Sequence, residues 1–277
     1  MTSVFLDGIL KGRVAFVTGG GTGISGGVAR ALAEAGANVA LVSRSLEHLE
    51  PAANAINEAR GVGSPTVREG SSTDVPSGEA FAVAADVRKP EDIEKAISAT
   101  VERFGKIDIV VNGAAGNFLC AAEELSPNGF GTVVDIDLKG TFNVCRAAFA
   151  ELKKEQGLIL NISATLHYVG TPMQLHVSAA KAGVDALTRN LAVEWGRYGI
   201  RVNGIAPGPI EDTEGMKRLV PEPIKEKLRK RVPLGRFGLI KDIENAAVFL
   251  CSEGANFING ETLVVDGGQW MAGNRLG

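Results

Sequence analysis

The chain has 277 residues, of which 45% are hydrophobic and 22% charged, so it is long enough to bury one large core and shows no compositional bias towards disorder. Its formal net charge of −3 argues against a general nucleic-acid-binding or membrane-surface protein, because such partners require a broad basic field. The 3 cysteines are odd in number and lie in apolar or helical segments, which favours buried free thiols over a disulfide or a metal site.

No stretch of the chain approaches the roughly 20 apolar residues that a bilayer-spanning helix requires. The first residues lack a basic region followed by an apolar run. Residues 274–277 do not form the small-basic-leucine tripeptide that directs proteins to peroxisomes. We therefore expect a cytoplasmic protein that binds neither membranes nor nucleic acid.

Short runs rich in β-branched residues alternate with longer helical segments. The runs that we predict as strands are Val14–Val17, Val39–Val42, Phe81–Ala85, Ile107–Val111, Leu158–Ile162, Val202–Ile205 and Thr262–Val265. A helix is predicted from about Ala179 to Arg197, with an apolar stripe made of Val184, Leu187, Leu191 and Trp195. Strands separated by helix-length segments form right-handed βαβ crossovers. The pattern therefore predicts a single α/β domain over residues 1–277, doubly wound and of Rossmann type, with a mostly parallel seven-stranded sheet and helices on both faces.

A glycine-rich turn follows the first predicted strand and opens a helix. Its pattern, Thr-Gly-x-x-x-Gly from Thr18 to Gly23, lets backbone N–H groups and the positive helix end face a pyrophosphate. We predict nucleotide contacts from Thr18, Gly19, Gly21, Thr22, Gly23 and Ile24. Ser25 replaces a third glycine that usually serves close packing, a position at which a small serine should be tolerated.

The second predicted strand ends at Ser43-Arg44-Ser45, where the adenosine ribose of a dinucleotide is read. An acid there would bind the ribose 2′-hydroxyl and repel a 2′-phosphate, whereas a guanidinium flanked by hydroxyls binds the phosphate with two hydrogen bonds. Arg44 therefore predicts NADP(H) as the cofactor. Further on, residues 61–79 turn to Gly, Ser, Pro, Thr and acids, which predicts a surface loop inserted before the third strand.

Together with Asn112-Gly113-Ala114-Ala115-Gly116 and Pro207-Gly208-Pro209-Ile210, these motifs resemble the short-chain dehydrogenase/reductase family over essentially the whole chain. The resemblance implies that Asp86 and Val87 hold the adenine ring. It also implies further cofactor contacts from Asn112, Gly113, Ala114, Lys181, Pro207, Gly208 and Ile210. Tetramers are common in the family, so we expect a homotetramer.

The proton-transfer residues depart from the family pattern, in which an asparagine, a serine, a tyrosine and a lysine act together. Lys181 is present, but Asp137 stands at the asparagine position, Ala164 at the serine position and Val177 at the tyrosine position. A buried carboxylate is costly unless it is paired, and Lys181 is the natural partner of Asp137. Such a pair can titrate as one unit and pass a proton through a bound water.

Tyr168 and His176 are two other candidates for a proton donor. We expect Tyr168 on a mobile loop, and we expect His176, next to Val177 on a helix, to point elsewhere. A carbonyl reductase must protonate an oxygen as hydride arrives, which suits a hydroxyl. A conjugated thioester reductase protonates a carbon later, which suits the pair of Asp137 and Lys181.

Within the family, the constellation resembles the peroxisomal type of 2,4-dienoyl-CoA reductase, which lacks the tyrosine. The similar segments are residues 112–119, 135–137 with 140–143, 161–166, and 206–210 with 213–215. This resemblance implies NADPH-dependent reduction of a 2,4-dienoyl-CoA to a 3-enoyl-CoA. It implies that Asp137 and Lys181 carry the protonating water and that Asn117, with Phe118, contacts the substrate.

Residues 211–236 concentrate basic side chains in an acidic protein, and we predict that they form the substrate flap. Such a cluster, including Arg218 and Arg229, suits the phosphates of coenzyme A, although a solvated helix face balanced by acids is the alternative. Two other functions stay open: a family reductase with a different enoyl or carbonyl substrate, and a catalytically silent NADP-binding protein. The presence of both Lys181 and Asp137 argues against silence.

Overall fold

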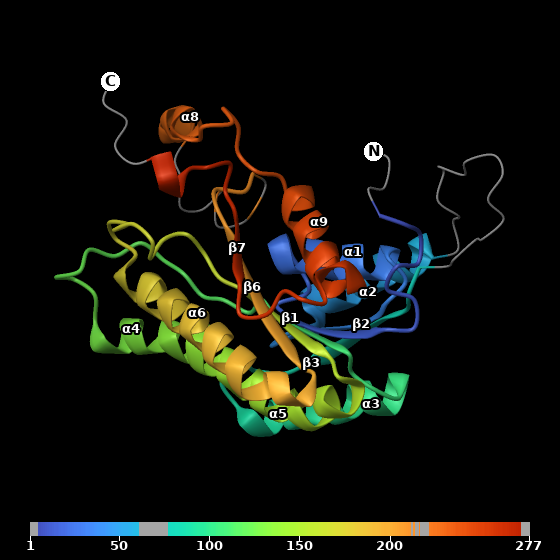
Figure 1. Ribbon diagram of the computed structural model, residues 1–277. Coiled ribbons are helices and arrows are strands. Elements are labelled where there is room, and N and C mark those ends of the chain that lie inside the picture. Colours follow the sequence, from blue (N-terminus) through green and yellow to red (C-terminus); the bar gives the residue numbers. More distant parts are fainter. Residues whose placement is uncertain (1–4, 61–76, 212, 214–215, 217–221, 273–277) are drawn as a thin grey trace, which may run out of the picture.

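A seven-stranded parallel sheet forms the centre of the computed structural model, which describes residues 5–60, 77–211, 213, 216 and 222–272 (Figure 1). The strands are β1 (Val14–Thr18), β2 (Asn38–Ser43), β3 (Ala80–Ala84), β4 (Ile109–Asn112), β5 (Leu158–Ile162), β6 (Arg201–Pro207) and β7 (Thr262–Val265). Their order across the sheet is β3-β2-β1-β4-β5-β6-β7, and every neighbouring pair is parallel. The predicted α/β fold is therefore confirmed.

Helices cover both faces of this sheet (Figure 1). One face carries α1 (Gly23–Glu34), α2 (Leu46–Ala59) and α9 (Ile240–Cys251). The other carries α3 (Pro90–Phe104), α5 (Gly140–Glu155) and α6 (Leu175–Trp195), with α4 (Pro127–Val134) packed along α6. A further helix, α8 (Glu222–Arg231), belongs to the predicted flap.

The two apolar cores lie on opposite faces of the sheet, and the strands contribute to both. Along β1, Ala15 and Val17 belong to the core under α1 and α9, while Phe16 belongs to the core under α3 and α5. Successive side chains of a strand point to opposite faces, so a strand buried on both faces is apolar throughout. This is why continuous β-branched runs located the strands in the sequence.

The helix α6 begins at Leu175, 4 residues before the predicted Ala179, and ends at Trp195 because residues 196–198 form a 3₁₀ turn. The earlier start places residues 176 and 177 within the helix. Val177, Lys181 and Asp185 follow one another at intervals of one helical turn and are all buried. One stripe of α6 thus faces the carboxyl end of β5.

The strand order reverses between β1 and β4, which are neighbours although β2 and β3 lie between them in the chain. In open α/β sheets, ligands bind at such a switch point, in the crevice outside the carboxyl ends of the strands. The loops that follow β1, β4, β5 and β6 therefore build the candidate site.

The cysteines are free, as predicted, and burial raises the pKa of Cys145 and of Cys251 to about 12. Among the helices that the structure describes, none combines the length and apolarity that crossing a bilayer requires. Most of the predicted insertion at 61–79 lies outside the described residues.

Candidate active site

The turn between β1 and α1 is shaped to receive a phosphate. Gly19 has a φ of +69°, and a Cβ there would lie 2.7 Å from the carbonyl oxygen of Gly113, so only glycine fits. The first N–H groups of a helix have no helical partners. In α1 the N-cap residue Thr22 makes no side-chain cap and the first turn holds no acid. This arrangement fits the pyrophosphate of a nicotinamide dinucleotide.

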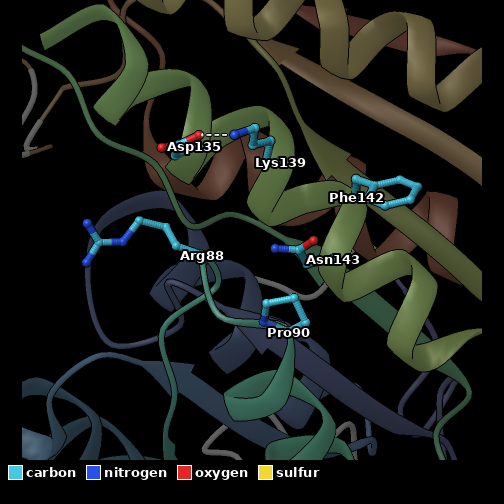
Figure 2. Close-up of a pocket in the computed structure, with 6 residues that line it drawn as sticks. All are labelled: Arg88, Pro90, Asp135, Lys139, Phe142 and Asn143. Atoms are coloured by element: carbon cyan, nitrogen blue, oxygen red, sulfur yellow. Dashed lines mark ion pairs between the residues drawn. The ribbon is translucent and has the colours of Figure 1, made fainter. Parts of the chain in front are cut away.

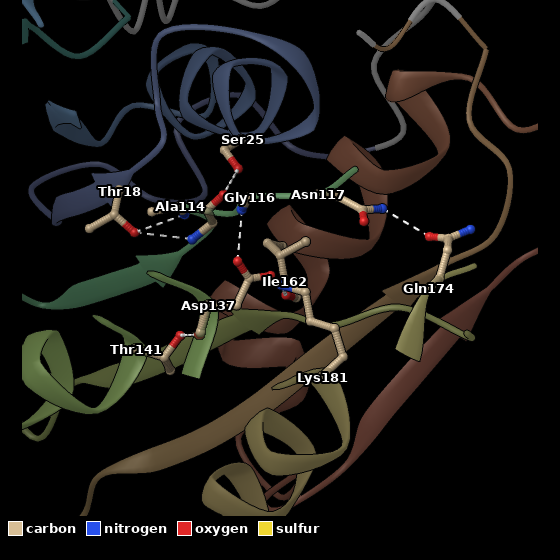
Figure 3. A network of polar contacts seen from close by, with 11 residues as sticks. Thr18, Ser25, Ala114, Gly116, Asn117, Asp137, Thr141, Ile162, Gln174 and Lys181 are labelled. Carbon is tan, nitrogen blue, oxygen red and sulfur yellow. Dashed lines mark hydrogen bonds and ion pairs between the residues drawn. The ribbon is translucent and has the colours of Figure 1, made fainter. Parts of the chain in front are cut away.

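Thr18 and Ser25 join the ends of β1 and β4 (Figure 3). Thr18 is buried, and its Oγ1 accepts hydrogen bonds from the backbone N–H groups of Gly113 (3.1 Å) and Ala114 (3.3 Å). The Thr18 hydroxyl therefore makes its hydrogen bonds within the protein, and the cofactor contact predicted for Thr18 stays a prediction. Ser25 Oγ donates to the carbonyl of Gly113 at 3.3 Å, so the residue that replaces the third glycine adds a bond.

Arg44 lies at the tip of β2, beside a hollow of about 250 Å³ that the start of the β3–α3 connection completes. The hydroxyls that flank it shape the turn: Ser43 Oγ donates to the carbonyl of Ser45 (3.1 Å), and Ser45 Oγ caps α2 by accepting from Glu47 N (3.2 Å). The guanidinium of Arg44 is therefore the group at this tip that suits a phosphate.

Asp86, implied to hold the adenine ring, is bound by a neighbouring arginine. The Nε of Arg88 donates to both carboxylate oxygens, at 2.9 and 3.0 Å. These hydrogen bonds, together with the charges of Arg88 and Arg44, lower the pKa of Asp86 although burial opposes the change. An adenine amino group would have to share the Asp86 carboxylate with Arg88.

The side chain of Asn112 points into the sheet. Its Nδ2 donates to Oδ1 of Asn161 at 2.9 Å, and the residue is 4% exposed. The Asn112 side chain is thus used within the sheet, and the cofactor contact implied for this residue stays a prediction. Directly after β6, a Cβ at Gly208 would lie 2.5 Å from the Cβ of Asp266, so glycine is required there. The other implied contacts, Val87, Pro207 and Ile210, are buried beside these strand ends.

Asp137 is fully buried on a π-helical turn, Asp135–Lys139, that joins α4 to α5. Gly140 N donates to the carbonyl of Asp135, and the Thr141 hydroxyl donates to the carbonyl of Asp137 at 2.7 Å. The Asp137 Oδ1 accepts from Gly116 N at 2.7 Å (Figure 3). Single π turns within α-helices are frequent at functional sites. Here the turn carries the carboxylate that the sequence singled out.

Lys181 and Asp137 form the predicted pair. The Lys181 Nζ lies 3.2 Å from Asp137 Oδ2 and donates to the carbonyl of Ile162 at 2.9 Å. The two side chains are 8% and 0% exposed. The contact is an ion pair that leaves Oδ2 without a hydrogen bond from the described residues. Oδ2 therefore keeps its capacity to accept a hydrogen bond from a water.

The position of the missing tyrosine is filled by apolar side chains. Val177 is 4% exposed and forms a cluster with Val133 and Ala180, against which Leu138 and Leu166 pack. Neither Val177 nor Ala164 has a hydroxyl to offer. The buried ion pair of Asp137 and Lys181 lies beside these two positions.

The loop after β4 holds the implied substrate contacts. Asn117 Nδ2 donates to Gln174 Oε1 at 2.9 Å (Figure 3). Phe118 is 37% exposed and lies on the ring of His176, with 4.3 Å between ring centroids. His176 itself is fully buried and packs under Phe118. The sequence did not reveal the contact of Gln174 with Asn117 or that of Gly116 with Asp137, because each joins segments far apart in the chain.

Tyr168 was expected on a mobile loop, but the structure anchors it. Its hydroxyl donates to Asp185 Oδ2 at 3.1 Å, and His167 Nε2 lies 2.8 Å from the same oxygen. Sequence reasoning missed His167 and Asp185. The available signal was the position of Asp185, one helical turn after Lys181.

The predicted flap is described only in part, and Arg218 lies outside the described residues. Arg229 on α8 donates to Glu226 at 2.9 Å, lies 3.7 Å from Glu211 and stands over the ring of Phe237. These acids partly balance the basic cluster, in line with the alternative of a solvated face.

A hollow of about 410 Å³ lies on the outer side of the π turn (Figure 2). It is lined by Arg88, Pro90, Asp135, Lys139, Phe142 and Asn143, and Asp135 and Lys139 form an ion pair of 2.7 Å. Asp137 and Lys181 do not line this hollow. It is therefore separate from the candidate active site.

Comparisons with known proteins agree with this geometry. The family profile described as enoyl-(acyl carrier protein) reductase matches residues 19–269. The peroxisomal 2,4-dienoyl-CoA reductase (3E-enoyl-CoA-producing) of Arabidopsis thaliana is 48% identical over 98% of this chain and 89% of its own length. That of Saccharomyces cerevisiae is 48% identical over 97% and 88%. A crystal structure of a short chain dehydrogenase from Bacillus anthracis matches with a TM-score of 0.79 and 41% identity, covering 94% of this chain and 97% of that one.

The expected cytoplasmic location is contradicted, because both of these enzyme relatives are named as peroxisomal. The expectation was drawn from the absence of a leader-like start, of a membrane-spanning stretch and of one targeting tripeptide, and such absences are not a sufficient argument. The family, in contrast, agrees with the nucleotide turn, the sheet order and the retained lysine. This chain belongs to the short-chain dehydrogenase/reductase family of oxidoreductases.

Proposed function

We propose that this chain is an NADPH-dependent reductase that converts a 2,4-dienoyl-CoA into a 3-enoyl-CoA. The observation that carries the proposal is the buried pair of Asp137 and Lys181, 3.2 Å apart, in a site where positions 164 and 177 supply no hydroxyl. The names of the two relatives support the same substrate class.

The reaction adds a hydride at C5 of the conjugated acyl group and a proton at C2, which leaves the remaining double bond between C3 and C4. When bound, the reduced nicotinamide supplies the hydride. The electron pair displaced from the diene moves onto the thioester carbonyl as an enolate, so the proton is needed at carbon after hydride arrival. A delayed proton of this kind can come from a water held by a buried acid–base pair.

The residues of this chain have separate tasks in that step. Gly116 N holds Asp137 through Oδ1, and Ile162 holds Lys181 through its carbonyl. Asp137 Oδ2 accepts a hydrogen bond from one O–H of the water, and the water gives its other proton to C2. The Lys181 ammonium returns a proton to the hydroxide that is left, and solvent then reprotonates the lysine amine. Lys181 also has a second role at the nicotinamide ribose. Asn117 and Phe118, on the loop after β4, contact the thioester end.

NADP(H) is proposed over NAD(H) because Arg44 stands at the tip of β2 with no acid at position 43 or 45. Arg218 and Arg229 are proposed to meet coenzyme A phosphates. A homotetramer is also proposed, because tetramers are common in the family. Light scattering at several protein concentrations measures the assembly.

The direct test is NADPH oxidation with a 2,4-dienoyl-CoA beside a 2-enoyl-CoA and a panel of ketones. We expect turnover with the dienoyl-CoA alone, with the product double bond between C3 and C4 by NMR. Turnover of ketones would replace the proposed reaction with another reductase activity. Binding of NADPH without turnover of any of these compounds would favour a silent NADP-binding protein.

A further inference from the structure

A second buried carboxylate, Asp185, lies one helical turn after Lys181 on α6 and is 3% exposed. Its Oδ2 meets two side chains of the β5–α6 loop, His167 Nε2 at 2.8 Å and Tyr168 OH at 3.1 Å. Burial raises the pKa of Asp185, but the contacts with His167, Ser163 and Tyr168 outweigh it and lower the pKa overall. The carboxylate is therefore ionised and collects the polar side chains of this loop.

An ionised carboxylate only accepts hydrogen bonds, which fixes the direction of each contact. The Tyr168 hydroxyl must donate, and the His167 ring must carry its proton on Nε2. With both rings held by one oxygen, His167 and Tyr168 pack edge to face, with 4.4 Å between centroids. Asp185 therefore sets the orientation of two successive aromatic side chains.

Tyr168 in turn contacts the segment after β7. Its ring packs edge to face on Trp270, at 5.3 Å between centroids. Trp270 is held in turn by Asp266, whose Oδ2 accepts from Trp270 N at 2.7 Å. The indole remains 36% exposed. The contacts thus run from a buried charge on α6 to an aromatic side chain at the carboxyl edge of the sheet.

Exposed apolar side chains gather on the loops at this edge, which we call the apolar rim. Its members are Phe118, Leu119, Val169, Met173, Leu175, Trp270 and Met271. They follow β4, β5 and β7, whose carboxyl ends lie at the same edge because the sheet is parallel. Cys120 N donates to the carbonyl of Met173 at 3.0 Å, which ties two of the loops together. Exposed apolar patches of this kind mark ligand-binding surfaces.

We propose that Asp185 is a positioning residue for acyl binding: by holding His167 and Tyr168 it fixes the β5–α6 loop against Trp270, and so shapes the apolar rim for the acyl chain of an acyl-CoA. The identity of the ligand rests on the proposed function. Asp185 does not deliver the proton, since Asp137 and Lys181 form a separate pair.

The test compares Asp185→Asn with Asp108→Asn, both made in a Trp195→Phe background. Trp270 is then the only tryptophan, because the chain has 2. Asp108 is a matched control: it is 1% exposed and bound by Arg13 and Lys106, but precedes β4 at the opposite edge of the sheet. The probes are dodecanoyl-CoA and free coenzyme A, titrated into the NADPH complex while the emission of Trp270 is followed.

Asp185→Asn should weaken the binding of dodecanoyl-CoA about tenfold or more. The affinity for free coenzyme A should change less than about twofold, because the lost contacts shape only the apolar rim. It should also raise KM for a dienoyl-CoA with kcat nearly unchanged. Asp108→Asn should leave both ligands unaffected even if it lowers the unfolding temperature. If Asp185→Asn does not fold, Tyr168→Phe serves as the test variant, and we expect its affinity for dodecanoyl-CoA to fall about threefold.

Unchanged affinity for dodecanoyl-CoA in the folded Asp185→Asn or Tyr168→Phe protein overturns the inference. An equal loss for both probes does so too, because it would mean general damage to the site. The two proposals can fail separately. If the native protein binds dodecanoyl-CoA and the variants weaken that binding as expected, but no dienoyl-CoA is reduced, the proposed reaction is refuted and the inference about Asp185 stands.

Discussion

Asp137→Asn isolates the role of the carboxylate, because the amide has nearly the same shape. The amide oxygen can keep the hydrogen bond from Gly116 N, which is 2.7 Å long in the native site. The amide NH₂ group then faces the Lys181 ammonium in place of Oδ2, so that a donor meets a donor 3.2 Å away. The substitution therefore removes the negative charge and one acceptor while preserving the backbone of the loop.

The structure sets the size of the expected effect. Removing one partner of a buried ion pair costs about 3–5 kcal/mol of stability, and the carbonyl of Ile162 still binds Lys181, so we expect the lower end. A general acid contributes about 10²–10⁴ to turnover, so kcat on a dienoyl-CoA should fall by about 100-fold or more. The dissociation constant of NADPH should stay within about twofold, because Asp137 does not line the nucleotide turn.

The assay is steady-state NADPH oxidation with a 2,4-dienoyl-CoA, beside a titration of NADPH. Asp135→Asn is the matched control: it lies on the same π turn, pairs with Lys139 at 2.7 Å and is 42% exposed. It should leave kcat unchanged, since a surface pair contributes little. Near-full activity of Asp137→Asn with normal NADPH binding would refute a proton-transfer role of the carboxylate.

Four further outcomes are expected. Arg44→Ala should weaken the binding of NADPH by about 1.5–3 kcal/mol without affecting the binding of NADH, and an equal loss of affinity for the two would contradict a role of Arg44 in phosphate binding. Arg229→Ala should raise KM for an acyl-CoA but not for a pantetheine thioester; a rise for both would mean that the flap acts through its fold. Val177→Tyr should lower the free energy of unfolding by about 1–3 kcal/mol without restoring ketone reduction, because the position is filled by Val133 and Ala180. Since the pKa of Asp185 is lowered from 3.8 in the folded protein, its stabilisation is complete above that value and is lost as pH falls through the folded-state pKa. Between about pH 6 and about pH 3, the free energy of unfolding in urea should decline less for Asp185→Asn than for the native protein. An equal decline in the two proteins would exclude this contribution of Asp185.

The sheet was predictable because each strand is buried on both faces. A run such as Leu158–Ile162 is apolar or β-branched at almost every position, and its predicted bounds match β5. The start of α6 was not predictable in the same way. Leu175 and His176 carry no N-cap signal, and the N-cap residue, Gln174, makes no side-chain cap. That end of the helix is placed by contacts with the loop after β4.

Within the site, the sequence predicted one pairing of side chains but not the partners of several others. Asp137 and Lys181 were paired on chemical grounds, since a buried carboxylate needs a partner, and the structure places them together. Thr18 and Asn112 were assigned to the cofactor from their motifs. The sequence did not show that their side chains bind neighbouring strand ends, where buried polar groups must find hydrogen-bond partners.

The π turn explains how the carboxylate of Asp137 is held in one orientation. A π turn leaves some helical carbonyls without their usual N–H partner, and the Thr141 hydroxyl satisfies the carbonyl of Asp137. Gly116 N then fixes Oδ1 from the opposite loop. The carboxylate is thus oriented by its own helix and by the loop that leads to Asn117. Because Oδ2 alone is left to Lys181, the pair has a buried charge with a fixed orientation, which the proposed proton transfer requires in place of the hydroxyl used elsewhere in the family.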